Sequence, residues 1–148
     1  MHSESGTMAT KLVLAVFRLN GLLVEEGDRL AAPLGLTSAR WQVLGAISMA
    51  VAPPTVPQIA VAMGMSRQGA RKQINLLAAS RLIEAIDNPA HKRSLCYRLT
   101  RRGDALYTRM HAIQVEWINS ISRGMSASAL RSALRQLDRL AERLDDLR

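Results

Sequence analysis

Apolar residues recur at the three-to-four-residue spacing of amphipathic helices at both ends of the chain. At the N-terminal end this spacing predicts a helix over residues 8–32, which the breaker Pro33-Leu34-Gly35 would end. Its apolar face consists of Leu12, Val16, Leu19, Leu23 and Leu30. A second helix is predicted to begin at Thr37 or Ser38 and to extend as far as Ala50. One of its faces consists of Trp41, Leu44, Ile47 and Ser48.

The C-terminal part contains two further predicted helices. The first runs from Arg101 or Arg102 to about Arg123, where Gly124 would end it, and the second follows Ser126. The apolar face of the first consists of Leu106, Met110, Ile113 and Trp117. That of the second consists of Leu130, Leu134, Leu137, Ala141 and Leu144, with Leu140 and Leu147 beside them. This four-three alternation is typical of coiled-coil contact.

Between these terminal helices, residues 55–80 have the pattern of a helix-turn-helix. Thr55 and Ser66 are suited to cap its two helices. Small Ala60 permits their close approach, and Gly64 can adopt the left-handed turn between them. The second helix would turn one face to the core, consisting of Ala70, Ile74, Leu77 and Ala78.

The opposite face of the second helix is polar and basic. Its side chains recur at i, i+3, i+4 and i+7, and are Gln68, Arg71, Lys72 and Asn75, with Arg67 beside them near the helix start. Arg and Lys pair with guanine edges or phosphates, and Asn and Gln pair with adenine, so this stripe fits a DNA major groove. The alternative interpretation is an ordinary solvated helix face.

Residues 82–100 follow with the pattern of a two-stranded hairpin, or wing. The turn is indicated by Asn88-Pro89. Strict alternation after the turn predicts inward-facing Leu95, Tyr97 and Leu99, with Cys96 and Arg98 facing outward. The tip carries His91, Lys92 and Arg93, which could lie along phosphates or in the minor groove.

Charge is concentrated in the same segment. Residues 55–103 contain nine Lys and Arg against two acidic residues, a net +7, whereas the rest of the chain contains eleven against ten, a net +1. A generally basic protein would spread its formal charge of +8 more evenly. The distribution therefore favours a nucleic-acid partner.

The composition fits one helical domain. The chain has 148 residues, of which 48% are hydrophobic and only 3% aromatic. We expect a mainly α fold with a small β-wing, in which a winged helix-turn-helix region (37–103) is flanked by N- and C-terminal dimerisation helices (8–32 and 104–148). Charges interrupt the apolar stretches, and no signal-peptide pattern precedes them. We therefore expect a cytoplasmic protein that does not bind a membrane.

The amphipathic terminal helices also predict the assembly. A wing module of about 50 residues cannot cover long apolar faces at both ends of the chain, so a two-fold dimer with interdigitating terminal helices is the simplest solution. Such a dimer would present two recognition helices to successive major grooves. In the alternative, the N- and C-terminal helices pack on each other within a monomer.

Several motifs, in this order and spacing, resemble the multiple-antibiotic-resistance regulator (MarR) family of bacterial winged-helix transcription factors. They are the segment from Ile59 to Ser66, Leu82-Ile83, the segment from Asn88 to Ser94, and the segment from Leu99 to Gly103. The resemblance implies a homodimer built from the first and the last two helices. It also implies a recognition helix from Ser66 to Ser80, a wing tip from Pro89 to Ser94, and repression at a pseudo-palindromic site on double-stranded DNA. In many family members a small aromatic or phenolic effector releases the DNA.

Two residues depart from the family pattern. His91 stands where an acidic residue commonly precedes the wing arginine, here Arg93, so the ion pair that orients this arginine is missing or formed differently. Arg81 stands where a glycine is frequent at the end of the recognition helix, so the geometry of that turn is open.

Two sets of site residues follow from these patterns. The predicted DNA-binding residues are Ser66, Arg67, Gln68, Arg71, Lys72, Asn75, His91, Lys92 and Arg93. By resemblance alone, the residues bordering an effector crevice would be Trp41, Met49, His111 and Trp117, although at helical spacing such residues are more often core.

Other functions find less support. The three histidines lack a paired-ligand spacing, no glycine-rich phosphate loop follows a strand, and Cys96 has no evident base partner, so we expect no enzyme activity, metal or cofactor. A sensing role for Cys96 or for His91 stays open beside an incidental one. The remaining alternative is a winged-helix protein-interaction module without specific DNA binding. Such a module would more naturally carry exposed apolar residues at the positions that are basic in this chain.

Overall fold

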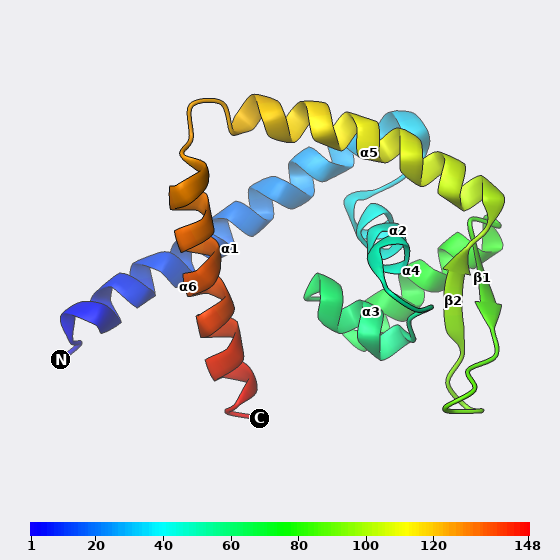
Figure 1. The fold of residues 1–148 in the computed structure, drawn as a ribbon, viewed down its shortest axis with the longest axis horizontal. Helices are drawn as coiled ribbons and strands as arrows, with labels where there is room; N and C mark the ends of the chain where they lie inside the picture. The colour runs from blue at the N-terminus through cyan, green and yellow to red at the C-terminus, as the bar shows by residue number, and fades with distance from the viewer. The chain divides into compact units, whose positions relative to one another are not determined.

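The computed structural model describes all residues from 1 to 148, and it has the expected mainly α fold with a small β-wing (Figure 1). The elements are α1 (Glu4–Ala31), the short 3₁₀ helix η1 (Ala32–Leu34), α2 (Ser38–Met49), α3 (Val56–Met63), α4 (Arg67–Ala79), β1 (Ile83–Ile86), β2 (Cys96–Leu99), α5 (Arg101–Ile121) and α6 (Ala127–Asp145). They form two compact units, Met1–Ile113 and Gln114–Arg148, with the boundary inside α5.

Side-chain caps mark the beginnings of most helices. Thr37, Thr55, Ser66 and Ser126 each accept a hydrogen bond from a backbone N–H in the first turn of α2, α3, α4 and α6. The caps at Thr55 and Ser66 were predicted from the sequence. At α3 the cap is reciprocal, because the Gln58 side chain also accepts from the backbone N–H of Thr55 (2.9 Å). Each such cap contributes about 1 kcal/mol to helix stability.

The first helix begins four residues earlier than residue 8, where the hydrophobic pattern placed its start. Ser3 caps it, because the Ser3 hydroxyl oxygen accepts from the backbone N–H of Gly6 (3.0 Å). The apolar periodicity starts only at Met8, so the pattern could not reveal the polar first turn.

The core of the first unit lies among α2, α3, α4 and the beginning of α5. Its largest fully buried side chains are Val43, Leu44, Ile59, Ile74, Leu77 and Met110. On α2 the prediction was partly wrong, because Ser48 is exposed whereas Val43 and Ala46 are buried beside Leu44 and Ile47. Five consecutive residues of α2, from Val43 to Ile47, are buried, so the helix is enclosed on more than one face.

A close contact joins α1 to α2 in the same unit. A Cβ at Gly27 would lie 2.7 Å from Ser38 Oγ, so any larger residue would force the Ser38 side chain to shift. Beside it, the backbone N–H of Ser38 donates to Asp28 Oδ1 (2.7 Å), which satisfies a free donor at the start of α2. The end of α1 is thereby tied to the helix that supports the helix-turn-helix.

Most of α1 is exposed along its length, and only Gly27 and Ala31 are buried. Its exposed apolar residues include Leu14 (62%) and Phe17 (69%). Together with η1 it is long and apolar enough to cross a membrane by length and composition alone, because Arg18 is the single charge between residues 12 and 24. Arg18 therefore interrupts this stretch, as expected, but a single charge leaves the helix within the length and composition of a span, which is weak evidence of one.

In the second unit, α5 ends at Ile121 and a short turn leads to α6. Gly124 has a φ of 81° in this turn, as its predicted role as a helix stop requires. No residue of α6 is buried. The exposed apolar side chains of α6 are Leu130, Leu134, Leu137 and Leu144.

Candidate nucleic-acid interface

The turn between α3 and α4 has the predicted helix-turn-helix geometry. Gly64 adopts the left-handed conformation (φ 61°), and the backbone N–H of Met65 donates to the Ala60 carbonyl (3.0 Å). Ala60 is buried at the contact between the helices. Ser66 then starts α4, because its hydroxyl oxygen accepts from the backbone N–H of Gly69 (2.9 Å).

One face of α4 packs into the core and fixes how the helix is rotated. Ala70, Ile74 and Leu77 are almost fully buried, as predicted. Ala78 is exposed, which corrects its assignment to the core face. The spacing i, i+4, i+7 of the three buried residues defines a narrow inward stripe, and Ala78 lies just beyond its edge.

The predicted polar stripe faces solvent. The exposed side chains are Arg67, Gln68, Arg71, Lys72 and Asn75, and the capping residue Ser66 is exposed as well. None of these five side chains forms a hydrogen bond or ion pair within the chain, so their donors and acceptors are directed to solvent. One helix thus presents two amides and three cations on a single accessible surface.

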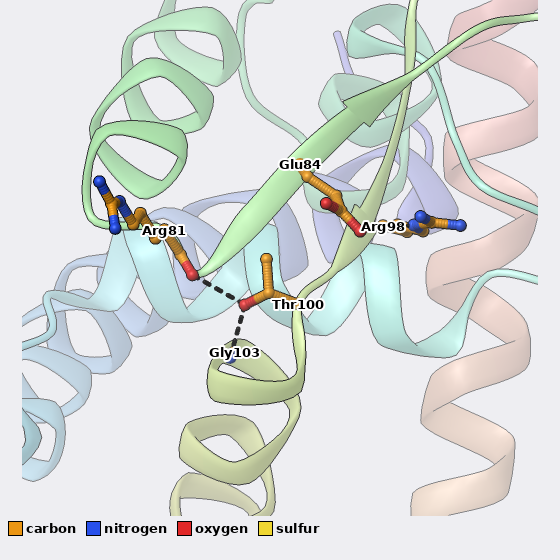
Figure 2. A network of polar contacts seen from close by, with 5 residues as sticks. All are labelled: Arg81, Glu84, Arg98, Thr100 and Gly103. Carbon is orange, nitrogen blue, oxygen red and sulfur yellow. Dashed lines mark hydrogen bonds and ion pairs between the residues drawn. The ribbon is translucent and has the colours of Figure 1, made fainter.

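The wing is an antiparallel hairpin in which Glu84 pairs with Arg98 and Ala85 with Tyr97. The Arg98 Nε donates to Glu84 Oε1 (2.7 Å) across the strands, so this cation is already paired (Figure 2). Such an exposed pair contributes about 0–1 kcal/mol to stability.

The predicted alternation around β2 is correct for Tyr97 and Arg98 but wrong for Leu95 and Cys96. Cys96 is buried (8% exposed) and Leu95 is exposed (42%), although Tyr97 is buried as expected. The segment before α3 pairs with the edge of β2, since Thr55 forms a β-bridge with Cys96 and the Tyr97 N–H donates to the Pro54 carbonyl (3.0 Å). Cys96 lines the same cavity as Met49, Pro54 and Thr55. The thiol of Cys96 is therefore not an outward group on the wing.

A local turn shapes the wing tip. Asn88 Oδ1 accepts from the backbone N–H of Ala90 (3.1 Å), and the Asn88 carbonyl accepts from the N–H of His91 (3.2 Å). His91, Lys92 and Arg93 are exposed. Arg93 forms no ion pair within the chain, and the cross-strand pair of this wing is instead Glu84–Arg98.

At the base of the wing, hydrogen bonds connect Arg81, Thr100 and Gly103, a contact that the sequence did not reveal (Figure 2). The Thr100 hydroxyl donates to the Arg81 carbonyl (2.7 Å) and accepts from the backbone N–H of Gly103 (3.0 Å). A Cβ at Gly103 would lie 1.8 Å from the Leu82 carbonyl oxygen, so the start of α5 can approach the start of the wing only through glycine. Arg81 has a φ of 58° and is the one non-glycine residue with a positive φ.

The four predicted effector residues do not line one cavity. Met49 lines a cavity of about 620 Å³ with residues of α3 and with Cys96, and neither Trp41 nor His111 lines it. Trp41 packs half-buried against the core, and His111 stacks on Tyr107 with ring centroids 6.3 Å apart. Trp117 belongs to the second unit.

Comparison with known proteins places this fold and its wing in a family. A model described as the MarR family matches residues 34–94. An uncharacterized protein of Mycobacterium tuberculosis is 34% identical over 130 residues, which cover 88% of this chain and 90% of the relative. The chain belongs to the MarR family. Solved MarR-family structures are transcription regulators, so the protein is a winged-helix transcriptional regulator and not an enzyme.

Solved structures of MarR-family regulators and similar proteins share the whole fold. One MarR-family transcription regulator is 27% identical, with a TM-score of 0.75 over 95% of this chain and 93% of its own. The M. tuberculosis regulator MosR, solved in complex with DNA, is 20% identical with a TM-score of 0.72 (89% and 96% covered). CouR from Rhodococcus jostii RHA1, solved with p-coumaroyl-CoA, is 16% identical with a TM-score of 0.77 (86% and 89% covered). At these identities the last two show the fold alone.

Proposed function

We propose that this MarR-family protein is a homodimeric, sequence-specific DNA-binding repressor that a small molecule releases from its operator. The observation that carries the proposal is the solvent-facing stripe on α4, in which Gln68, Arg71, Lys72 and Asn75 have no partner within the chain. Arg and Lys there would pair with guanine edges or phosphates, and the two amides would pair with adenine. His91, Lys92 and Arg93 at the wing tip would hold the flanking backbone or minor groove.

The homodimer is supported by the exposed apolar faces of the terminal helices. Phe17 on α1 and Leu134 on α6 are more than half exposed in the single chain. A second copy supplies the matching apolar surface that would cover them, and the two-fold axis of such a dimer matches a pseudo-palindromic operator. In this proposal the whole chain is one MarR-like domain, with 8–32 and 104–148 as dimerisation helices and 37–103 as the DNA-binding region.

Repression and ligand release are proposed from the family. CouR, whose fold is similar, was solved with p-coumaroyl-CoA, and MosR was solved with DNA. The chain itself would act in the cytoplasm, where its operator lies, and the apolar face of α1 would meet a partner helix and not lipid.

The test is a salt titration of binding to a labelled duplex from the upstream region of the protein's own gene, beside a scrambled duplex of equal length. We expect tight binding that weakens steeply with salt and prefers the upstream duplex by roughly a thousandfold. Equally weak binding to both duplexes would contradict a specific regulator of its own gene. No binding to either would favour the alternative of a protein-interaction module.

A further inference from the structure

The chain leaves α4 through a tight turn in which Arg81 takes the left-handed position. The Leu82 N–H donates to the Leu77 carbonyl (3.0 Å). The Arg81 N–H donates to the Ala78 carbonyl (2.9 Å), which completes the bond pattern of a Schellman motif. Leu77 and Leu82 are both buried in the core, where this motif usually places an apolar pair. The turn satisfies two carbonyls of α4, but the carbonyls of Arg81 and Leu82 lie outside both α4 and β1 and need other partners.

Thr100, at the opposite side of the wing base, binds both of these carbonyls. Its hydroxyl donates to the Arg81 carbonyl (2.7 Å) and accepts from the backbone N–H of Gly103 (3.0 Å), which caps α5 (Figure 2). Its own backbone N–H donates to the Leu82 carbonyl (3.0 Å). One residue thus joins the end of α4, the base of the hairpin and the start of α5.

Gly103 holds the same joint from the side of α5. The 1.8 Å that would separate a Cβ at Gly103 from the Leu82 carbonyl oxygen means that this oxygen lies against a bare Cα. Leu82 and Gly103 are buried, so water has little access to replace the bond from Thr100. The joint therefore has one arrangement in which its carbonyls are satisfied.

The Thr100 hydroxyl differs from the other capping hydroxyls of the chain. Those of Thr55, Ser66 and Ser126 accept from a backbone N–H and donate to no group within the chain. Thr100 caps its helix in the same way, but it also donates to a carbonyl 19 residues earlier. The accepted bond is sufficient for the start of α5, so the donated bond serves only the joint between α4 and the wing.

The joint lies at the base of the wing, whereas the cations proposed to hold DNA lie at its tip. The first strand pair above the joint is Ile83 with Leu99, and Lys92 lies seven residues before Leu99. At about 3.3 Å per residue, the tip is on the order of 20 Å from the base. A rotation of about 10° at the base would then move the tip by roughly 3 Å, which is enough to break a hydrogen bond to a phosphate.

We propose that Thr100 is a positioning residue for DNA binding, whose hydroxyl fixes the wing at one angle to α4. The tip cations and the α4 stripe then reach one DNA segment together, and the wing loses no rotational freedom when DNA binds. Thr100 acts through the tip cations and not by contact with DNA. This inference rests on the proposed DNA-binding function.

A double-mutant cycle on the upstream duplex tests the proposal. In the unaltered protein, Lys92→Ala should reduce the salt slope of binding by about one, because one phosphate contact is lost. In the Thr100→Val protein the same change should leave the slope nearly unaltered, because the tip is no longer held at the phosphates. The base preference that α4 provides should persist in Thr100→Val. An equal reduction by Lys92→Ala in both backgrounds would overturn the proposal.

Two further variants at Thr100 separate the donated bond from the cap. Thr100→Ser keeps the hydroxyl with both of its bonds and should behave like the unaltered protein. Thr100→Asp keeps the cap, because aspartate is a strong N-cap acceptor, but it has no proton to donate to the Arg81 carbonyl. It should therefore fold and reproduce the result of Thr100→Val. Its added charge weakens binding to all DNA, but the cycle compares slopes within one background. A full Lys92→Ala effect in Thr100→Asp would overturn the proposal.

The matched control is Thr37→Val, which makes the same chemical change at the cap of α2. The Thr37 hydroxyl accepts from the backbone N–H of Arg40 and donates to no carbonyl, so its loss removes a cap without opening the joint. Thr37→Val should keep the full effect of Lys92→Ala on the salt slope. Loss of that effect in Thr37→Val would overturn the proposal, because it would assign the result to lower stability.

A measurement without DNA distinguishes failure of this inference from failure of the proposed function. Spin labels at Gln68→Cys and Lys92→Cys, in a Cys96→Ser protein diluted with unlabelled protein, report the distance from α4 to the wing tip by pulsed electron paramagnetic resonance. We expect a narrow distance distribution with Thr100 or Thr100→Ser and a clearly wider one with Thr100→Asp. Equal widths would overturn the inference alone. A widened distribution without preference for the upstream duplex would overturn the DNA-binding function and, with it, the use of the positioned wing.

Discussion

Arg81 lies between the end of α4 and the wing, in a conformation that suits glycine better than arginine. Its φ of 58° lies in the left-handed region, which costs a residue with a side chain roughly 1–2 kcal/mol. The neighbouring contacts maintain this conformation, because Thr100 holds the Arg81 carbonyl and Gly103 packs against Leu82. The departure from the family glycine was visible in the sequence. The Thr100 and Gly103 contacts were not, since they join residues about 20 positions apart whose proximity arises only when the hairpin closes.

The strain at Arg81 predicts a stabilising substitution. Arg81→Gly should raise the free energy of unfolding by about 0.5–1 kcal/mol, because removal of the strain exceeds the entropy that glycine loses on folding. Arg81→Val should lower it by about 1 kcal/mol, because a β-branched residue tolerates positive φ least. Urea titrations at one protein concentration measure both. A less stable Arg81→Gly protein would show that the arginine side chain contributes more than the strain costs.

At the scale of elements, the sequence predicted the helices more reliably than the strands. Capping residues such as Thr55 and Ser66 act within three or four positions, so local sequence contains the information that starts α3 and α4. The alternation failed at Leu95, which precedes β2, and at Cys96, beside which Pro54 and Thr55 pair with the edge of the strand from another part of the chain. The polar stripe of α4 was predictable in full. None of its side chains has a partner within the chain, so helix periodicity alone sets their exposure.

The two elements proposed to contact DNA should respond differently to the loss of one cation. Arg71→Ala on α4 should cost about 1–3 kcal/mol of specific binding and relax the preference at one base position. Lys92→Ala on the wing tip should weaken binding to all sequences alike and reduce the salt slope by about one. Fluorescence anisotropy on a set of single-base operator variants distinguishes the two. If Arg71→Ala left both affinity and sequence preference unchanged, the proposed orientation of α4 on DNA would be wrong.

At the scale of the whole molecule, the terminal helices expose more apolar surface than a solvated monomer needs. Large contiguous apolar surfaces on soluble proteins usually mark interaction sites. The coiled-coil spacing of α6 indicated this from the sequence, and the absence of buried residues in α6 agrees with it. The exposed Phe17 was outside the predicted α1 face, because the strict helical spacing that defined that face omitted it.

The dimer claim predicts the effect of charge on the α6 face. The unaltered protein should sediment as a dimer at micromolar concentration, and Leu134→Glu/Leu137→Glu should sediment as a monomer, because an interface would bury both carboxylates unpaired. Gln136→Glu adds a charge beside the stripe and should remain a dimer. A folded monomer of the unaltered protein at that concentration would refute the claim.

The central claim is that a dimer places two α4 helices on one operator, and hydroxyl-radical footprinting of the upstream duplex tests it most directly. The account predicts two protected segments whose centres lie about one helical turn, roughly 10 base pairs, apart or at a multiple of it. Both segments should disappear together in the Leu134→Glu/Leu137→Glu protein. A single protected segment, or protection that persists unchanged in that variant, would contradict the account.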